Sequence, residues 1–210
     1  MAVLVLHQEV MERLLLQDFD MNDFNMLMLF PCNVMFKEER GLITENLISI
    51  SKEILLKNAE TPFHSKCIST VRTKSDILEL SEFSGIKQFL GNLVYVYCEQ
   101  MKIDCSKLSI LDSWLNLYEE GGYQDLHNHH DSMISGVFWL QSSEEKDFVF
   151  QAPWHFMQPK LPNYTEYNLN NCHNVEINSN VGRGMVFMSH MLHRTLPTKT
   201  ERISLSFNVG

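Results

Sequence analysis

The stretch Arg202-Ile203-Ser204-Leu205-Ser206-Phe207-Asn208 alternates polar and apolar side chains along its whole length. On a β-strand, successive side chains point to opposite faces of the sheet. One face would therefore carry Ile203, Leu205 and Phe207, and the other a polar set whose only charge is that of Arg202. Because solvent-facing strands more often carry Lys and Glu, the pattern favours a strand whose polar face lines the inside of a barrel. A half-exposed antiparallel strand is the alternative.

Shorter segments of similar character fill the rest of the second half of the chain. They are rich in Val, Ile, Phe and Trp and are separated by Gly, Asn, Asp and Pro, which is the pattern of short strands joined by turns. The expected strands are 109–118, 133–140, 147–151, 174–178, 184–189 and 202–209.

The first half has the periodicity of amphipathic helices. Apolar residues recur at helical spacing over 5–16, 42–57 and 82–101, and Ser81 is the expected N-cap of the last helix. Helices followed by many short strands predict a mostly β fold, a double-stranded antiparallel barrel with the N-terminal helices packed on one outer face. We expect the change of character near residue 105 to be a change of layer within one domain.

Composition excludes several classes of protein. The 210 residues are 44% hydrophobic, enough for a sizeable core, and carry a net charge of −9, which argues against a nucleic-acid-binding protein. No apolar stretch reaches the roughly 20 residues that span a bilayer, and the apolar start lacks the basic residues of a signal peptide. Five cysteines, an odd number without a C-x-x-C pair, indicate free thiols in a reducing compartment. The expectation is a cytoplasmic protein that binds neither nucleic acid nor membranes.

Histidines cluster in the run Leu126-His127-Asn128-His129-His130-Asp131. On a strand, residues i and i+2 face the same side, so either His127 with His129 or His129 with Asp131 could face inward together. With a third ligand such as His193, 66 residues downstream (193 − 127), either pair would give a facial metal site with open positions. A polar loop is the alternative for the run, and one of His190 and His193 could be a structural histidine.

An inward-facing Arg202 strengthens the metal hypothesis. A buried guanidinium is costly unless an acid meets it, and its planar fork suits a carboxylate. The only acidic residue nearby in sequence is Glu201, which alternates to the other face of the strand. A bound dicarboxylate beside the metal would therefore satisfy Arg202.

Several motifs in combination resemble the 2-oxoglutarate/Fe(II)-dependent oxygenases, in particular a group common in phage and bacterial genomes. The similarity covers about 29–209, and it implies the host cytoplasm as the location if the chain is phage-encoded. The motifs are Leu29-Phe30-Pro31, Trp114-Leu115-Asn116, His127-Asn128-His129, Ser135-Gly136-Val137-Phe138-Trp139, Gly184-Met185-Val186-Phe187-Met188-Ser189, His193 and Arg202-Ile203-Ser204-Leu205-Ser206-Phe207-Asn208. The resemblance implies a jelly-roll (double-stranded β-helix, cupin-like) domain over 29–210, with a helical layer over about 29–105 and the barrel over about 106–210. Residues 1–28 would be a helical extension.

The resemblance also implies roles for individual residues. His127 and His193 would bind iron, and Arg202, helped by Ser204, would pair with the distal carboxylate of 2-oxoglutarate. AlkB-type oxygenases carry Asn-x-Tyr eleven residues before the first ligand, and Asn116 and Tyr118 stand in that register as cosubstrate contacts. The same register puts His129 where the family usually has a carboxylate. We favour His127, His129 and His193 as the metal-binding and catalytic set, with Asp131 as the rival carboxylate ligand. Trp139 is either a cosubstrate contact or a core residue.

The implied cofactors are Fe(II), 2-oxoglutarate and O2, and the implied reaction is hydroxylation of a C–H bond with release of succinate and CO2. A catalytically inactive jelly-roll binding protein and a three-histidine cupin-like metal enzyme that does not use 2-oxoglutarate are the alternatives. The substrate, a small molecule or a protein, cannot be read from the sequence, and a homo-oligomer is compatible with it. We hypothesise that the aromatic, Asn-rich loop over 152–173 borders the substrate entrance.

Overall fold

A computed structural model describes residues 32–62, 65–154 and 163–210. The helix expected over 5–16, the extension over 1–28, the boundary at 29 and the Leu29-Phe30-Pro31 motif lie outside the described residues. The strands are β1 (Val34–Glu38), β2 (Ser65–Lys66), β3 (Ile68–Ser69), β4 (Ile110–Tyr118), β5 (Tyr123–His127), β6 (Ile134–Gln141), β7 (Lys146–Gln151), β8 (Asn174–Asn178), β9 (Arg183–Met188), β10 (His193–Thr195) and β11 (Arg202–Val209). The helices are α2 (Glu45–Asn58) and α3 (Ser84–Met101), with 3-10 turns at Arg40–Leu42, Ile77–Glu79 and Ser81–Phe83.

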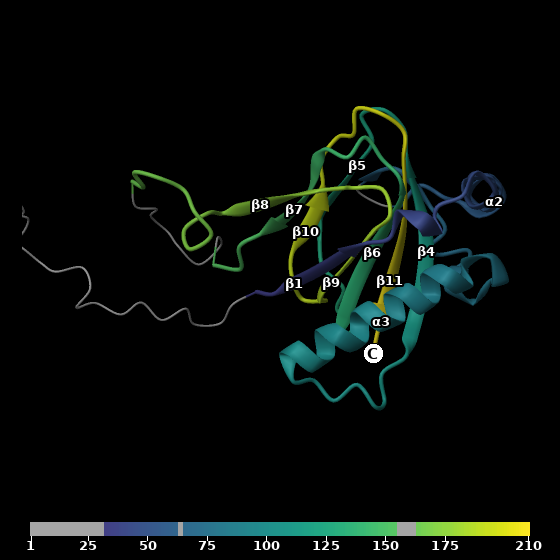
Figure 1. The fold of residues 1–210 in the computed structure, drawn as a ribbon. Coiled ribbons are helices and arrows are strands. Elements are labelled where there is room, and N and C mark those ends of the chain that lie inside the picture. Colours follow the sequence, from purple (N-terminus) through teal and green to yellow (C-terminus); the bar gives the residue numbers. More distant parts are fainter. Residues whose placement is uncertain (1–31, 63–64, 155–162) are drawn as a thin grey trace, which may run out of the picture. The chain divides into compact units, whose positions relative to one another are not determined.

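The strands form two antiparallel sheets (Figure 1). The larger has the order β1-β9-β6-β11-β4-β3, and the smaller has the order β2-β5-β10-β7-β8. β11, which contains the alternating segment Arg202–Asn208, lies inside the larger sheet, where it pairs with both β4 and β6. Helices α2 and α3 pack on the larger sheet, as expected of a double-stranded β-helix with helices on one face. The fold class is confirmed, although the two sheets are not joined into a closed barrel.

The two faces of β11 belong to two different packing layers, as its alternation predicts. Ile203, Leu205 and Phe207 are fully buried in the cluster formed with α2 and α3. The opposite face turns toward a second, smaller cluster between the sheets, made of Val137, Trp139, Phe148, Phe150, Met185, Phe187 and Met191. The space between the sheets is therefore apolar at this cluster. Three polar residues of β11, Arg202, Ser204 and Ser206, line the pocket that adjoins it.

The helices begin where local chemistry allows. The side chain of Thr44 caps α2 by accepting a hydrogen bond of 3.1 Å from the Leu47 amide. The expectation that Ser81 caps α3 is wrong, because Ser81 starts a separate 3-10 turn and its hydroxyl bonds Glu82. The residue before α3 is Phe83, which is buried, so packing and not a side-chain cap fixes the start of that helix.

The region expected to be a helical layer also contains strands. β1 forms one edge of the larger sheet, and the two-residue strands β2 and β3 extend β5 and β4. β1 has the sequence Val-Met-Phe-Lys-Glu, and its last three residues are exposed. Its apolar residues form one short run without the alternation that marks a half-buried strand in sequence. Among the described residues, no helix has both the length and the apolar character needed to cross a bilayer.

Candidate metal centre

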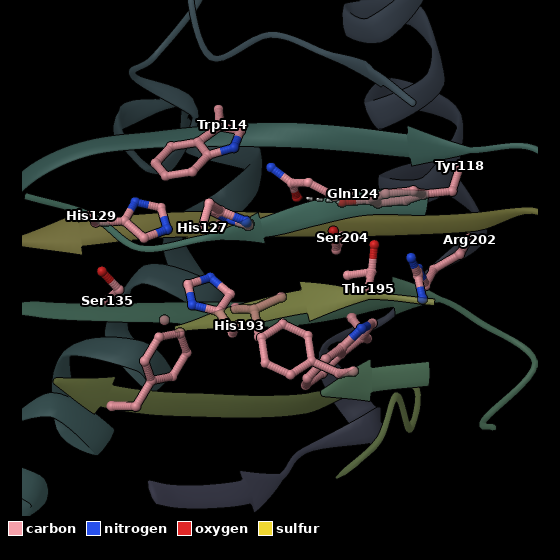
Figure 2. A pocket seen from close by; sticks show the side chains of 16 residues that line it. Trp114, Tyr118, Gln124, His127, His129, Ser135, His193, Thr195, Arg202 and Ser204 are labelled. Atoms are coloured by element: carbon pink, nitrogen blue, oxygen red, sulfur yellow. Dashed lines mark hydrogen bonds between the residues drawn. The ribbon is translucent and has the colours of Figure 1, made fainter. Parts of the chain in front are cut away.

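Three of the predicted ligands meet between the sheets. His127 is the last residue of β5 and His193 the first of β10, and the two are direct partners in the antiparallel register. Their ring centroids lie 4.3 Å apart, and the His129 ring lies 5.3 Å from each of them. One ring nitrogen from each residue can be chosen so that all three lie within 4.8 Å of one another. Figure 2 shows the three rings gathered at one end of the pocket.

His129 does not lie on the same strand as His127, although strand alternation predicted that the two would face inward together. β5 ends at His127, so His129 is not part of the strand. Its backbone amide donates a 3.0 Å hydrogen bond to the Ser189 carbonyl, which fixes the loop that follows β5. Its ring is nearly parallel to that of His193, with an interplanar angle of 6°. His129 therefore reaches the site through a backbone hydrogen bond to Ser189, the residue after β9, and not through strand alternation.

Hydrogen bonds fix which nitrogen of two histidines is free. Nδ1 of His127 lies 2.8 Å from the Asp125 carbonyl, and Nδ1 of His193 lies 2.9 Å from the Met191 carbonyl. A carbonyl can only accept, so each Nδ1 carries the proton and each Nε2 keeps a lone pair. Such an outer hydrogen bond orients a metal-binding imidazole and raises its basicity.

All three imidazoles are held in their neutral form. Burial lowers the pKa of His127, and burial together with the neighbouring His127 and His130 lowers the pKa of His129 to about 4. Burial beside His127 lowers the pKa of His193 well below its ordinary value. Neutral imidazole is the form that binds first-row transition metals. The donor set therefore fits a divalent metal such as iron, bound by His127, His129 and His193.

The rival ligand is not in this group. Asp131 is exposed in the turn after His129, and His130 and His190 are exposed as well. Among the described residues, one group could hold a metal, and it consists of His127, His129 and His193 without a carboxylate. The structure thus brings His129 to the other two histidines and leaves Asp131 outside.

The predicted carboxylate-binding arginine is at the other end of the same pocket (Figure 2). Arg202 is fully buried, and its guanidinium stacks over the Tyr118 ring at 4.1 Å from the centroid. Its Nη1 donates to Oδ2 of Asp147 on β7, whereas its Nε and Nη2 have no hydrogen-bond partner. The expectation that Arg202 needs a bound acid because no acid of the chain meets it is therefore wrong: Asp147 lies 55 residues earlier in sequence but beside Arg202 in space. The guanidinium still has two N–H donor nitrogens without an acceptor, which could bind a second acid.

The other predicted cosubstrate contacts divide into two groups. Tyr118, Ser204 and Trp139 line the pocket, and the Tyr118 hydroxyl donates to Gln124 at 3.0 Å. Asn116 is buried behind the pocket wall, where its Oδ1 accepts from Ser69 at 2.7 Å and its Nδ2 donates to Ser206 at 3.1 Å. Its amide therefore links β3, β4 and β11 and already has partners on both sides.

Three further residues of this region, Gln124, Asp147 and Thr195, were not singled out from the sequence, and Trp114 was named only as part of a motif. Trp114 contacts the His129 ring at 5.8 Å between centroids. Gln124 and Thr195 lie on β5 and β10, two strands that the sequence pattern did not reveal. Burial raises the pKa of Asp147, and the adjacent Arg202 opposes the rise. The loop over 152–173 joins β7 to β8, and its residues 155–162 lie outside the described part of the chain.

The strand-rich second half of the chain is similar to a known protein family. Residues 112–208 match a family model described as "putative 2OG-Fe(II) oxygenase". Similar solved structures include a prolyl-4-hydroxylase from Pseudomonas putida, at TM-score 0.59 and 13% identity over 84% of this chain and 92% of the other. HygX from Streptomyces hygroscopicus, solved with nickel, 2-oxoglutarate and hygromycin B, has TM-score 0.55 and 13% identity over 85% and 83%. An oxidoreductase of the 2OG-Fe(II) oxygenase family from Burkholderia pseudomallei has TM-score 0.55 and 11% identity over 84% of both chains. No curated protein matches the sequence significantly.

Proposed function

We infer that this chain, an oxidoreductase of the 2-oxoglutarate/Fe(II)-dependent oxygenase class, hydroxylates a C–H bond of an organic substrate. The balanced reaction takes R–H, O2 and 2-oxoglutarate to R–OH, succinate and CO2. One observation carries the proposal: three neutral imidazoles and an arginine with two unpaired nitrogens line opposite ends of one buried pocket. The first group suits a metal dication and the second suits a carboxylate, so the pocket suits a metal and a dicarboxylate together.

The residues of the pocket would have different roles in this reaction. His127, His129 and His193 would hold the iron, and the carbonyls of Asp125 and Met191 keep two of these rings in the correct orientation. Bound iron and 2-oxoglutarate supply the activation of O2, which the protein itself cannot perform. Arg202 would orient the distal carboxylate of 2-oxoglutarate, with the hydroxyl of Ser204 beside it. Phe148, Phe187 and Trp139 line the same pocket and exclude water from it.

The first part of the test does not need the substrate, because the metal and 2-oxoglutarate are proposed to bind in the same pocket. The protein is reconstituted anaerobically with Fe(II), 2-oxoglutarate is added, and the visible charge-transfer band of the chelate is recorded. Oxygen is then admitted, and succinate is quantified. We expect the band and succinate in the wild type, loss of the band in His193→Ala, and at least about a tenfold weaker response to 2-oxoglutarate in Arg202→Gln, since each charge-assisted bond contributes about 1.5–3 kcal/mol.

Lys199→Ala is the matched control for Arg202→Gln, because Lys199 is also paired with an acid but its side chain is 77% exposed. This variant should behave as the wild type. Thermal melts of each variant exclude loss of fold as the cause. A wild type that gives neither band nor succinate would refute the proposal.

A three-histidine enzyme that does not use 2-oxoglutarate is the second candidate, and the absence of a carboxylate from the ligand group favours it. It predicts metal binding that is indifferent to 2-oxoglutarate. The unpaired Nε and Nη2 of Arg202 argue against it, because a buried guanidinium without a second acid has no evident use there.

A further inference from the structure

An ion pair joins the two sheets at the end of the pocket opposite the histidines. Asp147 comes from β7 of the smaller sheet and Arg202 from β11 of the larger one. Their side chains are 5% and 1% exposed, so both charges are removed from water. A buried pair of this kind gains little over an apolar pair of the same volume, because desolvation offsets the attraction. Because Arg202 lines the pocket, the pair points to a role beyond stability.

The contact uses only one nitrogen of the guanidinium. Nη1 donates to Asp147, while Nε and Nη2 have no partner. Nε–H and the N–H of Nη2 that is parallel to it form the side-on edge of the fork, which is one of the two edges that bind a carboxylate through two parallel hydrogen bonds. Asp147 thus occupies the remaining nitrogen and leaves one complete bidentate edge open.

The charges of the pocket give Asp147 a second effect. The charges of the buried Asp147–Arg202 pair sum to zero. An arginine alone would give the pocket a charge of +1 and would bind any dianion tightly. The carboxylate of Asp147, paired with Arg202 behind the pocket lining, reduces that attraction, because it repels an acid that approaches Arg202.

We propose that Asp147 is a positioning residue, which holds Arg202 with its side-on edge toward the pocket. Its negative charge also lowers the affinity of Arg202 for dicarboxylates enough for them to exchange. The proposal rests on the proposed function, since the dicarboxylates concerned are 2-oxoglutarate and succinate. Its consequence is kinetic as well as thermodynamic. Succinate is a dianion too, so a stronger Arg202 site would retain the product.

The test measures binding without turnover. Wild type and Asp147→Asn are loaded anaerobically with Mn(II) and titrated with 2-oxoglutarate and, separately, with succinate. Asparagine keeps an acceptor for Nη1 and removes the negative charge. We expect both dicarboxylates to bind about tenfold more tightly in Asp147→Asn. In turnover assays with Fe(II), both the KM for 2-oxoglutarate and kcat should fall, since slow succinate release limits the cycle; a merely structural substitution would not lower KM.

Thermal melts give a second readout. Asp147→Asn leaves a buried cation without a counter-charge, so the variant should melt lower than the wild type when no ligand is present. Succinate should then raise its melting temperature more than it raises that of the wild type. The matched control is Glu145→Gln, which neutralises a carboxylate two residues away that is paired with exposed Lys199. This control should leave both affinities unchanged.

The outcomes separate this inference from the proposed function. Should the wild type bind no 2-oxoglutarate, both fail. Unchanged or weaker dicarboxylate binding in folded, metal-binding Asp147→Asn overturns only the role of Asp147. If Asp147→Asn does not fold, Asp147→Glu keeps the charge and displaces the guanidinium. It should then raise the Kd of 2-oxoglutarate without changing that of Mn(II), and an unchanged Kd of 2-oxoglutarate overturns the positioning role.

Discussion

His129 stands at a position where the resemblance leads one to expect a carboxylate, and the structure makes clear what the exchange implies. The residue sits in a loop fixed by the Ser189 carbonyl, and its ring is parallel to that of His193. Its low pKa of about 4 means that it offers a neutral nitrogen and no negative charge. The nearest acid in sequence, Asp131, is exposed. The choice between the two residues, which the sequence left open, becomes a measurable difference in metal binding.

We expect His129→Ala to weaken Mn(II) or Co(II) binding by at least about ten- to a hundredfold, since even an outer partner of a ligand contributes that much. Asp131→Asn should stay within about twofold of the wild type, because its side chain reaches none of the three rings. Titration calorimetry under anaerobic conditions measures both. A larger loss in Asp131→Asn than in His129→Ala would show that the loop rearranges around the metal and that Asp131 is the ligand.

At this scale, the sequence predicted the polar residues better than their partners. Strand alternation placed Arg202 and Ser204 inward, and both line the pocket. The partner of Arg202 was missed, because Asp147 lies on a strand of the other sheet and nothing local in sequence relates the two. Asn116 was expected to face a cosubstrate, yet its amide is engaged by Ser69 and Ser206. Alternation predicts the face of the strand on which a side chain lies, but its contact partners depend on how the two sheets pack.

The strands of the larger sheet depend on the absence of side chains at particular positions. Gly136 on β6 pairs with Phe207 on β11. A Cβ at Gly136 would lie 2.4 Å from the Phe207 ring and 2.7 Å from the Met185 carbonyl oxygen. Phe207 is fully buried and the carbonyl belongs to a paired strand, so neither can move away cheaply.

Gly136→Ala should therefore lower the free energy of unfolding by about 1–3 kcal/mol, the usual cost of overpacking a core. The control is Gly91→Ala in α3, where a Cβ would meet nothing within 4 Å and the position is exposed. That change should raise the free energy of unfolding by about 0.5–1 kcal/mol, because alanine favours the helix. Urea denaturation of the two variants checks both signs. Equal effects in the two variants would contradict the packing argument.

Elements with a strong apolar pattern were predicted well. All six expected strands are present within one residue at each end, from β4 to β11. Both expected helices among the described residues are present as α2 and α3. β5 and β10 were missed because one is Tyr-Gln-Asp-Leu-His and the other has three residues, so neither has a strand's apolar alternation. These two strands carry His127 and His193, so the sequence pattern is weakest at the site itself.

The residues proposed to bind the metal and the dicarboxylate come from different sheets. The smaller sheet and the loop after β5 contribute the three histidines, and β11 of the larger sheet contributes Arg202. The sheets are linked at the Arg202 end by Asp147. With neutral ligands and a neutral ion pair, the pocket has no net charge to offset a metal dication. A dianionic ligand would then be the main counter-charge available to it.

We therefore expect metal and 2-oxoglutarate to bind cooperatively. The presence of 2-oxoglutarate should tighten Mn(II) binding by a factor of about 5–150, and Mn(II) should tighten 2-oxoglutarate binding by the same factor, because coupling between two sites is reciprocal. His129→Asp adds one negative charge to the ligand group. It should raise the affinity for Mn(II) alone and reduce the coupling factor, since part of the counter-charge is then already present.

Anaerobic titration calorimetry gives all four dissociation constants for each protein, and closure of the cycle checks the measurement. Asp131→Asn serves as the control, because it changes the charge of the same loop outside the histidine group. Its coupling factor should equal that of the wild type. If Mn(II) bound the wild type equally well with and without 2-oxoglutarate, the three histidines would have to stabilise the dication without help. The pocket would then not need a dianion to balance the metal's charge, and a three-histidine enzyme that does not use 2-oxoglutarate would become the better description.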